Sequence, residues 1–469
     1  MKNLCRAVIV ILAMSLTYIV CSRILLLKSE DGIEQMQSLY LQDKDTVDAL
    51  LLGSSHIYCD VNTGILWDRY GISAYDLGGA EQPYWNNYYF LKEALKTQHP
   101  KVIVLDVTIP GIRSVEYQPE VWSVTNLYGL RWNKNRVEST RVSVPKASFK
   151  RLMIPMNTMH TRYKELTKDD FVDSNRSINY KGFDLRERIV PFDRPDMSGV
   201  TETTPMTEKE ETYFRKIIEL ANSKNIPILL VSVPFPVYEE AQKVYNYEFQ
   251  IAEELGVPYI DFNKGNYYDE IGLDFEKDFA DEFHLNVSGN EKFSAYLGGY
   301  LADQYRLTDH RGDKAYKSWD ADALIQRQEA KCANLGNAKT AEDYLPLLQD
   351  DSYIIFASIG DGAEESELVA ENGQVLRELG ITEENLAANT AMILNSGQVI
   401  YASAENEMKS VADLGKDKLL LKRTSGNGDF TTEVTIDGKT YEIDCYRGVK
   451  FVVYDTLLKR VISQEDFDL

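Results

Sequence analysis

The chain has 469 residues, five of them cysteine, and a formal net charge of −22 at neutral pH. This length predicts two or three domains. So acidic a chain is not typical of a nucleic-acid-binding protein, which needs a basic surface. The cysteines are widely separated and form no Cys-x-x-Cys pair or Cys/His cluster. We therefore expect no structural zinc site, no disulfide-based fold, and neither a metal nor a cofactor.

The first 28 residues have the pattern of a membrane anchor. Lys2 and Arg6 precede a mainly apolar stretch from Ala7 to Leu27, which is long enough to cross a bilayer at about 20 residues. A buried core helix and a cleavable signal peptide are the alternatives, but no small-x-small cleavage site follows the apolar core. The basic flank favours an uncleaved, single-pass anchor in the cell membrane, with everything after Lys28 outside the cytoplasm.

From residue 46 onward, apolar strands alternate with helical patterns. The expected strands are Val47–Leu52, Ile72–Leu77, Val102–Val107, Ile226–Val233 and Tyr259–Phe262. The expected helices are Tyr84–Thr97, Glu208–Ser223, Val237–Leu255 and Ser288–Tyr305. Strands that are apolar on both faces and alternate with helices are typical of a parallel sheet covered on both sides. The pattern predicts a doubly wound α/β domain over residues 46–305.

The first strand ends in the sequence Gly53-Ser54-Ser55-His56. Ligands of open parallel α/β sheets bind just beyond the carboxyl ends of the strands, and Gly53 permits a tight turn at this point. Either serine is therefore a candidate nucleophile, provided that the chain supplies a base.

The candidate base lies in Asp281-Glu282-Phe283-His284, directly before the last helix of this domain. A short loop can hold Asp281 beside His284, so that the carboxylate orients one ring nitrogen while the other faces a serine. The remaining histidines lie in a pre-strand turn, in an insertion, in a linker, or next to the serines: His99, His160, His310 and His56.

Gly53-Ser54-Ser55 and Asp281-x-x-His284 resemble the first and last motif blocks of the SGNH (GDSL-type) hydrolase superfamily, whose first block is Gly-Asp-Ser. The resemblance covers roughly residues 46–305 and implies a flavodoxin-like doubly wound sheet. It implies that Ser55 is the nucleophile, with Ser54 as the alternative. His284 is then the general base and acid, and Asp281 orients it.

The same resemblance implies an oxyanion hole with a glycine amide from the block after the second strand. Gly78 and Gly79 are both available there, and we prefer Gly79. The third block of the superfamily, Gly-x-Asn-Asp, is absent, because the third strand continues as Val-Leu-Asp-Val-Thr-Ile-Pro-Gly. Gln82 is the candidate replacement for its asparagine donor.

The Gly-Ser-Ser form, the anchor and the absent third block are similar to an envelope acyltransferase-like subgroup that includes D-alanyl-lipoteichoic acid transfer proteins (DltD type). This resemblance implies a serine esterase or O-acyltransferase that acts on O-acyl groups of a cell-envelope polysaccharide or a teichoic acid-like polymer. Its partners would be that glycopolymer or an acyl donor. The alternative is a non-catalytic polymer-binding or assembly protein that retains the fold.

Residues 108–200 form an insertion with 16 lysines and arginines against 11 aspartates and glutamates. Trp132 and Phe149 are interleaved with its basic residues. The insertion is either an ordinary solvated face or a cover over the active-site end of the sheet that attracts an anionic or sugar polymer. A ring of its cations around Ser55 would favour acyl transfer to a bound acceptor over hydrolysis.

After a linker at residues 306–330, residues 331–469 are expected to form a smaller accessory domain of α/β or α+β type. Its expected elements are a strand at Tyr353–Ser358, a helix near Glu364–Leu379, and hairpins at 395–402 and 436–443. The region resembles the interleukin-like EMT inducer domain, which implies a carbohydrate or protein partner. The alternative is an accessory domain without a ligand.

Overall fold

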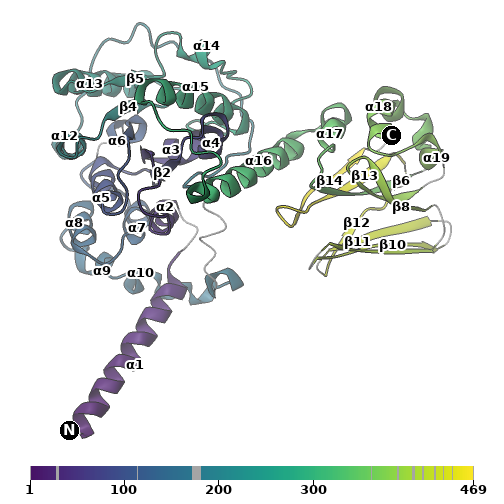
Figure 1. The fold of residues 1–469 in the computed structure, drawn as a ribbon, viewed down its shortest axis with the longest axis horizontal. Coiled ribbons are helices and arrows are strands. Elements are labelled where there is room, and N and C mark those ends of the chain that lie inside the picture. The colour runs from purple at the N-terminus through teal and green to yellow at the C-terminus, as the bar shows by residue number, and fades with distance from the viewer. Residues whose placement is uncertain are drawn as a thin grey trace. The chain divides into compact units, whose positions relative to one another are not determined.

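The computed structural model describes two compact units, Met1–Leu324 and Ile325–Leu469 (Figure 1). The described residues are 2–27, 31–112, 115–171, 181–360, 362–387, 390–403, 407–414, 417–426, 429–436, 438–445 and 447–467.

A five-stranded parallel sheet forms the centre of the first unit, in the order β2-β1-β3-β4-β5. Its strands are β1 (Ala49–Gly53), β2 (Ala74–Gly78), β3 (Val102–Asp106), β4 (Ile228–Ser232) and β5 (Tyr259–Asp261). This flavodoxin-like order places the point where the chain reverses its winding between β1 and β3, and ligands bind at such a point. The predicted doubly wound α/β fold is confirmed, and each predicted strand overlaps an observed one.

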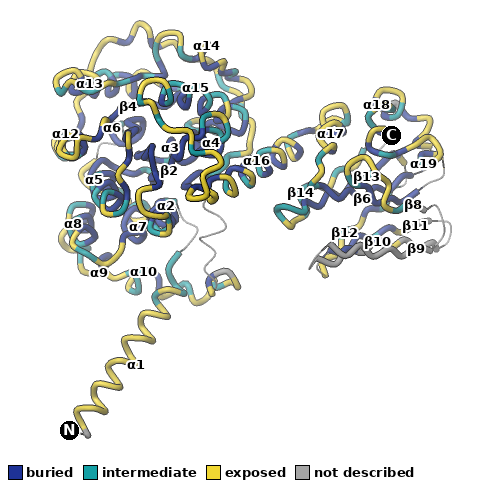
Figure 2. The backbone as a smooth tube through the Cα atoms, viewed as in Figure 1, coloured by how far each residue is buried: buried dark blue, intermediate teal, exposed yellow. Residues whose placement is uncertain are grey.

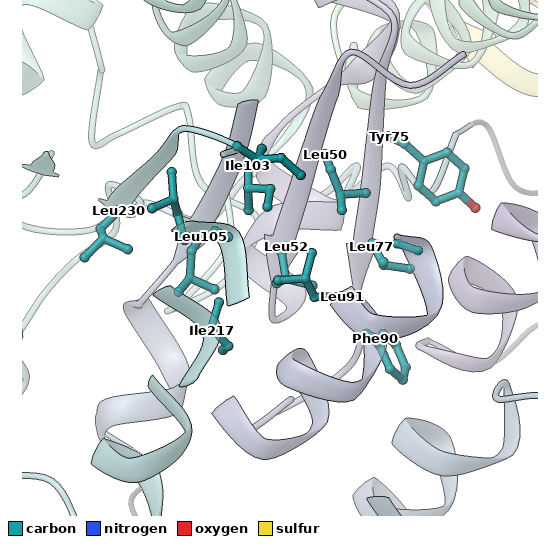
Figure 3. Packing of buried hydrophobic residues seen from close by; sticks show 14 of the residues in the cluster. Leu50, Leu52, Tyr75, Leu77, Phe90, Leu91, Ile103, Leu105, Ile217 and Leu230 are labelled. Atoms are coloured by element: carbon teal, nitrogen blue, oxygen red, sulfur yellow. The ribbon is translucent and has the colours of Figure 1, made fainter. Parts of the chain in front are cut away.

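Alternate side chains of the sheet are buried on its two faces. One face packs against α5 (Tyr84–Ala94) and α12 (Glu208–Ser223), and Figure 3 shows Leu50, Leu52 and Leu105 of this cluster near Leu91 and Ile217. The other face packs against α4 (Thr63–Tyr70) and α15 (Val287–Tyr305), and α13 (Glu239–Leu255) contributes buried residues to both clusters. Burial on both faces explains why the strands are continuously apolar.

Two short helices that we did not predict follow β1. They are α3 (Ser55–Asp60) and α4 (Thr63–Tyr70). Five of the six residues in α3 are buried, and Ser55 is the exception. This helix therefore has no polar outer face and no amphipathic pattern by which to recognise it.

The insertion is mostly helical. It contains α6 (Thr108–Ile112), α7 (Glu120–Tyr128), α8 (Lys134–Ser143), α9 (Phe149–Met153), α10 (Met156–Met159) and the 3₁₀ turns η1 (His160–Lys164) and η2 (Lys168–Phe171). Helix α7 packs against α2 (Ile33–Leu39), and α8 packs against α5. A small apolar cluster forms here, with Ile33 from α2 and Leu127, Leu152 and Met159 from the insertion.

Helix α1 (Lys2–Leu25) is the one helix in the described part of the chain that is long and apolar enough to cross a membrane. Its residues are exposed along most of its length (Figure 2). At its end, Leu25, Leu26 and Leu27 pack against the apolar cluster of the insertion, and Arg162 Nη1 donates to Leu25 O at 2.9 Å. Helix α1 is therefore a candidate membrane anchor.

The second unit contains two antiparallel sheets. One has the order β14-β13-β6-β7-β8, from β6 (Tyr353–Ile359), β7 (Ala391–Asn395), β8 (Gln398–Ser403), β13 (Val449–Asp455) and β14 (Arg460–Phe467). The other has the order β12-β11-β10-β9, from β9 (Glu407–Leu414), β10 (Asp417–Gly426), β11 (Asp429–Ile436) and β12 (Lys439–Glu442).

Helices cover one face of the five-stranded sheet, and the four-stranded sheet packs against its other face. The helices are α17 (Ala341–Leu347), α18 (Glu367–Glu378) and α19 (Glu383–Ala387). The expected strand, helix and hairpins lie where we placed them, and this α+β class is confirmed. Helix α16 (Lys317–Asn337) occupies part of the range that we expected to be a linker.

Glu34 in α2 gives a prediction about stability. Its side chain is buried and Oε1 has no hydrogen-bond partner among the described residues. Burial, together with repulsion from Asp184 and Asp31, raises the pKa of Glu34 to about 8 from its ordinary value of 4.5. Because the folded chain binds this proton more tightly than the unfolded chain, the free energy of unfolding falls as the pH rises from about 5 to about 8.

We expect Glu34→Gln to remove this fall in the free energy of unfolding. The melting temperature of the variant in detergent should then exceed that of the wild type by a margin that grows from pH 5 to pH 8. The effect is at most about 1.4 kcal/mol per pH unit. Glu253→Gln, an exposed change on α13, is the control and should show no such trend. A margin for Glu34→Gln that does not change with pH would contradict the prediction.

Candidate active site

The two candidate serines have different environments. Ser54 is fully buried, and its Oγ donates to Asp106 Oδ2 at 2.8 Å while its backbone N–H lies 3.2 Å from the same oxygen. Asp106 is the last residue of β3, so Ser54 links the carboxyl ends of two adjacent strands. Ser55 is the first residue of α3 and is partly exposed. Ser55 is therefore the serine available to a substrate.

His284 connects Ser55 to Asp281. Its Nε2 lies 2.8 Å from Ser55 Oγ, and its Nδ1 lies 2.9 and 3.0 Å from the two carboxylate oxygens of Asp281. An ionised carboxylate only accepts hydrogen bonds, so Nδ1 carries the proton and Nε2 accepts the hydroxyl proton of Ser55. The structure thus brings the three predicted residues together in the order that activates a serine hydroxyl.

The Asp281 carboxylate also shapes the loop that carries the histidine. Its Oδ1 accepts the backbone N–H groups of Phe283 at 2.9 Å and His284 at 3.0 Å. Burial raises the pKa of Asp281, but the hydrogen bonds and charge of His284 and these backbone donors outweigh it, and the pKa lies well below its ordinary value. Ala280 N–H donates to His284 O at 2.8 Å and closes the loop. The imidazole is therefore held in place before any substrate binds.

Helix α3 holds this loop from its other end. Asp60, its last residue, accepts the backbone N–H of Leu285 at 2.8 Å and lies 2.8 Å from His56 Nδ1 through its second oxygen. His56 is fully buried, and its ring centroid lies 5.3 Å from those of both His284 and Phe235. His56 thus packs behind the imidazole of His284, and its Nδ1 faces Asp60.

The proposed oxyanion residues lie just beyond β2. A Cβ placed on Gly79 would lie 2.1 Å from Asn126 Oδ1 and 2.7 Å from Gln82 Oε1, so only glycine fits there. Gln82 is buried, and its side-chain amide donates to Asn87 Oδ1 at 2.5 Å. Gly78 lies closer to the β1 turn, since a Cβ there would be 2.6 Å from Ser54 O.

One part of the insertion reaches the site. Asp184 N–H donates to Tyr58 O at 2.6 Å, and Val190 N–H donates to Phe279 O at 2.9 Å. Asn286 Nδ2 donates to Arg188 O at 3.1 Å. The chain from 184 to 190 therefore runs along α3 and the His284 loop.

The basic stretch of the insertion, residues 130–151, makes its contacts elsewhere. The Arg131 guanidinium lies 4.0 Å from the centre of the Tyr40 ring, and that of Arg136 lies 4.8 Å from the Trp132 ring. Arg151 forms an ion pair with Glu120. The expected ring of cations around Ser55 is not formed by these arginines.

Sequence patterns did not reveal Asp106, Asp60 or the place of His56. A polar end to the apolar strand β3 was the one signal for Asp106. In the described part of the chain, no group of three or more His, Cys, Asp or Glu side chains is arranged to hold a metal ion.

No family model and no curated protein matches the chain. Among solved structures, it is similar to a protein described as lipolytic, of the G-D-S-L family, from Desulfitobacterium hafniense DCB-2 (10% identity, 54% of this chain and 98% of that chain, TM-score 0.28). It is also similar to a protein described as an acylhydrolase from Bacteroides fragilis NCTC 9343 (11% identity, 58% of this chain and 95% of that chain, TM-score 0.30).

A third similar structure is that of a gut microbial diltiazem-metabolizing enzyme (13% identity, 82% of this chain and 57% of that chain, TM-score 0.21). Because these identities and TM-scores are low, the function of the chain has to be inferred from the geometry of Ser55, His284 and Asp281.

The link between Asp60 and the His284 loop gives a prediction. Asp60→Ala removes the acceptor for Leu285 N–H and frees the loop, whereas Asp60→Asn keeps an oxygen there. Misplacing a reacting group by about 1 Å can cost about 100-fold in rate. We expect Asp60→Ala to slow labelling of Ser55 by a fluorophosphonate by about 10- to 100-fold, and Asp60→Asn to retain most of the rate. Equal rates for Asp60→Ala and wild type would show that the loop is held without this carboxylate.

Proposed function

We propose that the chain is a serine esterase or O-acyltransferase that works through an acyl-enzyme on Ser55. The observation that carries the proposal is the chain of hydrogen bonds from Ser55 Oγ through His284 to Asp281. His284 Nε2 takes the hydroxyl proton as Oγ attacks the carbonyl carbon of an ester. The same nitrogen then gives this proton to the departing alcohol oxygen, and the acyl group stays on Ser55.

The second half of the reaction uses the same groups in reverse. Water or a sugar hydroxyl loses its proton to His284 Nε2 and attacks the acyl carbon, and Ser55 recovers its proton as it leaves. Asp281 stabilises the imidazolium in both halves. Gly79 and Gln82 are the proposed oxyanion donors, and their place directly after β2, whose last residue Gly78 pairs with Gly53, supports this role. One such donor contributes about 3 kcal/mol to stabilising the transition state.

We propose that this chemistry takes place outside the cytoplasm, on O-acyl groups of a cell-envelope polysaccharide or a teichoic acid-like polymer. An exposed apolar helix with a basic amino-terminal flank supports single-pass anchoring by α1 in the cell membrane. The resemblance of the Gly-Ser-Ser motif to the DltD-type subgroup supports the polymer and its acyl donor as partners.

The acceptor decides between esterase and transferase. A soluble ester offered together with an oligosaccharide should yield acylated sugar if the acceptor is a hydroxyl, and only free acid if it is water.

We propose that the second unit recognises a carbohydrate or a protein, as its resemblance to the interleukin-like EMT inducer domain implies. The sequence of this unit contains no histidine that could serve as a base of its own.

The assignment of the nucleophile is tested with a fluorophosphonate probe. We expect Ser55→Ala to abolish labelling of the full chain. Ser54→Ala should still be labelled, although losing the bond to Asp106 should lower its stability by about 1 kcal/mol. Persistent labelling of Ser55→Ala would exclude it as the nucleophile. A wild-type chain that is not labelled at all would favour the polymer-binding alternative.

Asp281→Asn tests the role of the carboxylate. An amide at this position can donate to Nδ1 and force the proton onto Nε2, so that His284 can no longer accept from Ser55. We expect a loss of about 10⁴-fold in the rate of p-nitrophenyl acetate hydrolysis, the size known for this change in serine proteases. Glu282→Gln, an exposed neighbour in the same loop, is the matched control and should keep the wild-type rate. Equal losses in both variants would contradict a specific role for Asp281.

A further inference from the structure

A cavity of about 710 Å³ lies where α1 meets α2 and the turn between α7 and α8. Ile19 of α1 and Leu26, directly after this helix, form one wall, and Leu130 and Trp132 of the insertion lie on the other. Its volume lies within the range of small-molecule sites, about 300–1,000 Å³. The cavity is lined by residues other than those that hold Ser55 and His284.

Among the residues that the structure describes, the charged side chains that line the cavity are all arginines: Arg23, Arg131 and Arg136. In a chain with a net charge of −22, three arginines without an acidic residue indicate that the cavity suits an anion.

Arg136 is the most informative of the three, because its side chain is only 3% exposed. Its Nη1 donates to Leu130 O at 2.7 Å, but Nε and Nη2 have no hydrogen-bond partner among the described residues. Its guanidinium lies 4.8 Å from the Trp132 ring and 5.4 Å from the Tyr128 ring. Burial lowers the pKa of Arg136 to about 10, so the group remains cationic at neutral pH.

A buried cation is costly unless an anion and hydrogen bonds compensate for it. On the opposite wall, Ser22 Oγ is likewise buried and has no partner among the described residues. The cavity thus holds unused donors on two sides, from α1 and from α8, and these can meet on a single group with several acceptor oxygens. A guanidinium fork matches a phosphate group well.

The position of the cavity indicates which phosphate. Tyr18, Ile19 and Ser22 lie in the last turns of the candidate membrane helix, which is where lipid headgroups would surround it. Trp132 is 61% exposed beside the cavity, as is common for tryptophan at a membrane interface. A ligand that fits this setting has a phosphate at Arg136 and an apolar chain along α1.

We propose that this cavity binds the phosphate of a membrane-lipid headgroup, with Arg136, Arg131 and Ser22 as donors and the lipid chains beside α1. The inference rests on the proposed membrane anchoring and does not depend on the chemistry at Ser55. The same donors would also accept free phosphate, so the experiment has to separate these two sources.

The test uses the full chain in a neutral detergent and counts bound lipids by native mass spectrometry. Phosphatidylglycerol is the probe, diacylglycerol of the same chain length tests the need for phosphate, and inorganic phosphate is the competitor. We expect the wild type to retain phosphatidylglycerol in preference to diacylglycerol, and Arg136→Gln to weaken this binding about tenfold. Arg141→Gln, an exposed change on the same helix whose guanidinium lies over Phe149, is the matched control and should bind as the wild type does.

Equal binding by Arg136→Gln and the wild type would overturn the site, as would equal retention of diacylglycerol. If inorganic phosphate binds as tightly as phosphatidylglycerol, the source is free phosphate and the lipid proposal is wrong. The melting temperature of each variant, compared with that of the wild type, shows whether the variant is folded. Should Arg136→Gln lose its fold, Arg131→Gln decides by the same comparison.

The anchoring is tested separately by flotation with phosphatidylcholine vesicles. A wild-type chain that does not float with these vesicles would contradict the anchoring proposal itself. Flotation combined with lipid binding that does not depend on Arg136 would overturn the lipid site alone. The two failures are therefore distinguishable.

Discussion

The carboxylate of Asp60 connects two parts of the first unit that the chain keeps far apart. It accepts a hydrogen bond from Leu285, which lies 225 residues away in sequence, and it does so from the last residue of a helix whose first residue is Ser55. The nucleophile and the loop of its base are therefore attached to the two ends of one rigid element of six residues. Ser55 and the loop of His284, which are 2.8 Å apart at Oγ and Nε2, are thus both positioned by the same helix.

The remaining contacts strengthen this arrangement from neighbouring strands. Ser54 links the end of β1 to Asp106 at the end of β3, and Asp281 folds its own loop through backbone donors. Asp60 and Asp281 thus each have two tasks, one for folding the His284 loop and one for placing the reactive side chains. Such a site needs little reorganisation when an ester binds, which is how enzymes obtain electrostatic stabilisation without a further cost.

Much of this architecture could be predicted from sequence, because strands buried on both faces and amphipathic helices leave strong local patterns. Helix α12 begins and ends at the predicted residues, Glu208 and Ser223. The two motifs also placed Ser55, Asp281 and His284 at positions that the fold then brings together. Helix α3 was missed because it is buried almost all round, and Asp60 because its partners are distant in sequence and leave no local signal.

The basic stretch of the insertion shows the opposite difficulty. Its composition indicated an anion site, but charge patterns carry no information about which surface of the fold the side chains will face. Arg131 lies over the ring of Tyr40, directly after α2. Arg136 lies over the ring of Trp132 in the turn between α7 and α8. The sequence therefore could not predict where these arginines lie in the fold.

The join between α1 and the rest of the first unit has a consequence for how far Ser55 can reach. Leu25, Leu26 and Leu27 pack into the same apolar cluster as Leu127 and Met159, and Arg162 holds the end of the helix through Leu25 O. With α1 in the membrane, as proposed, this packing makes the join a stiff one, unlike the flexible linkers that let a tethered domain sample a wide volume. Ser55 would then be held at a fixed height above the bilayer. Polymer that is anchored in the same membrane would pass this height, whereas material deeper in the wall would remain beyond it.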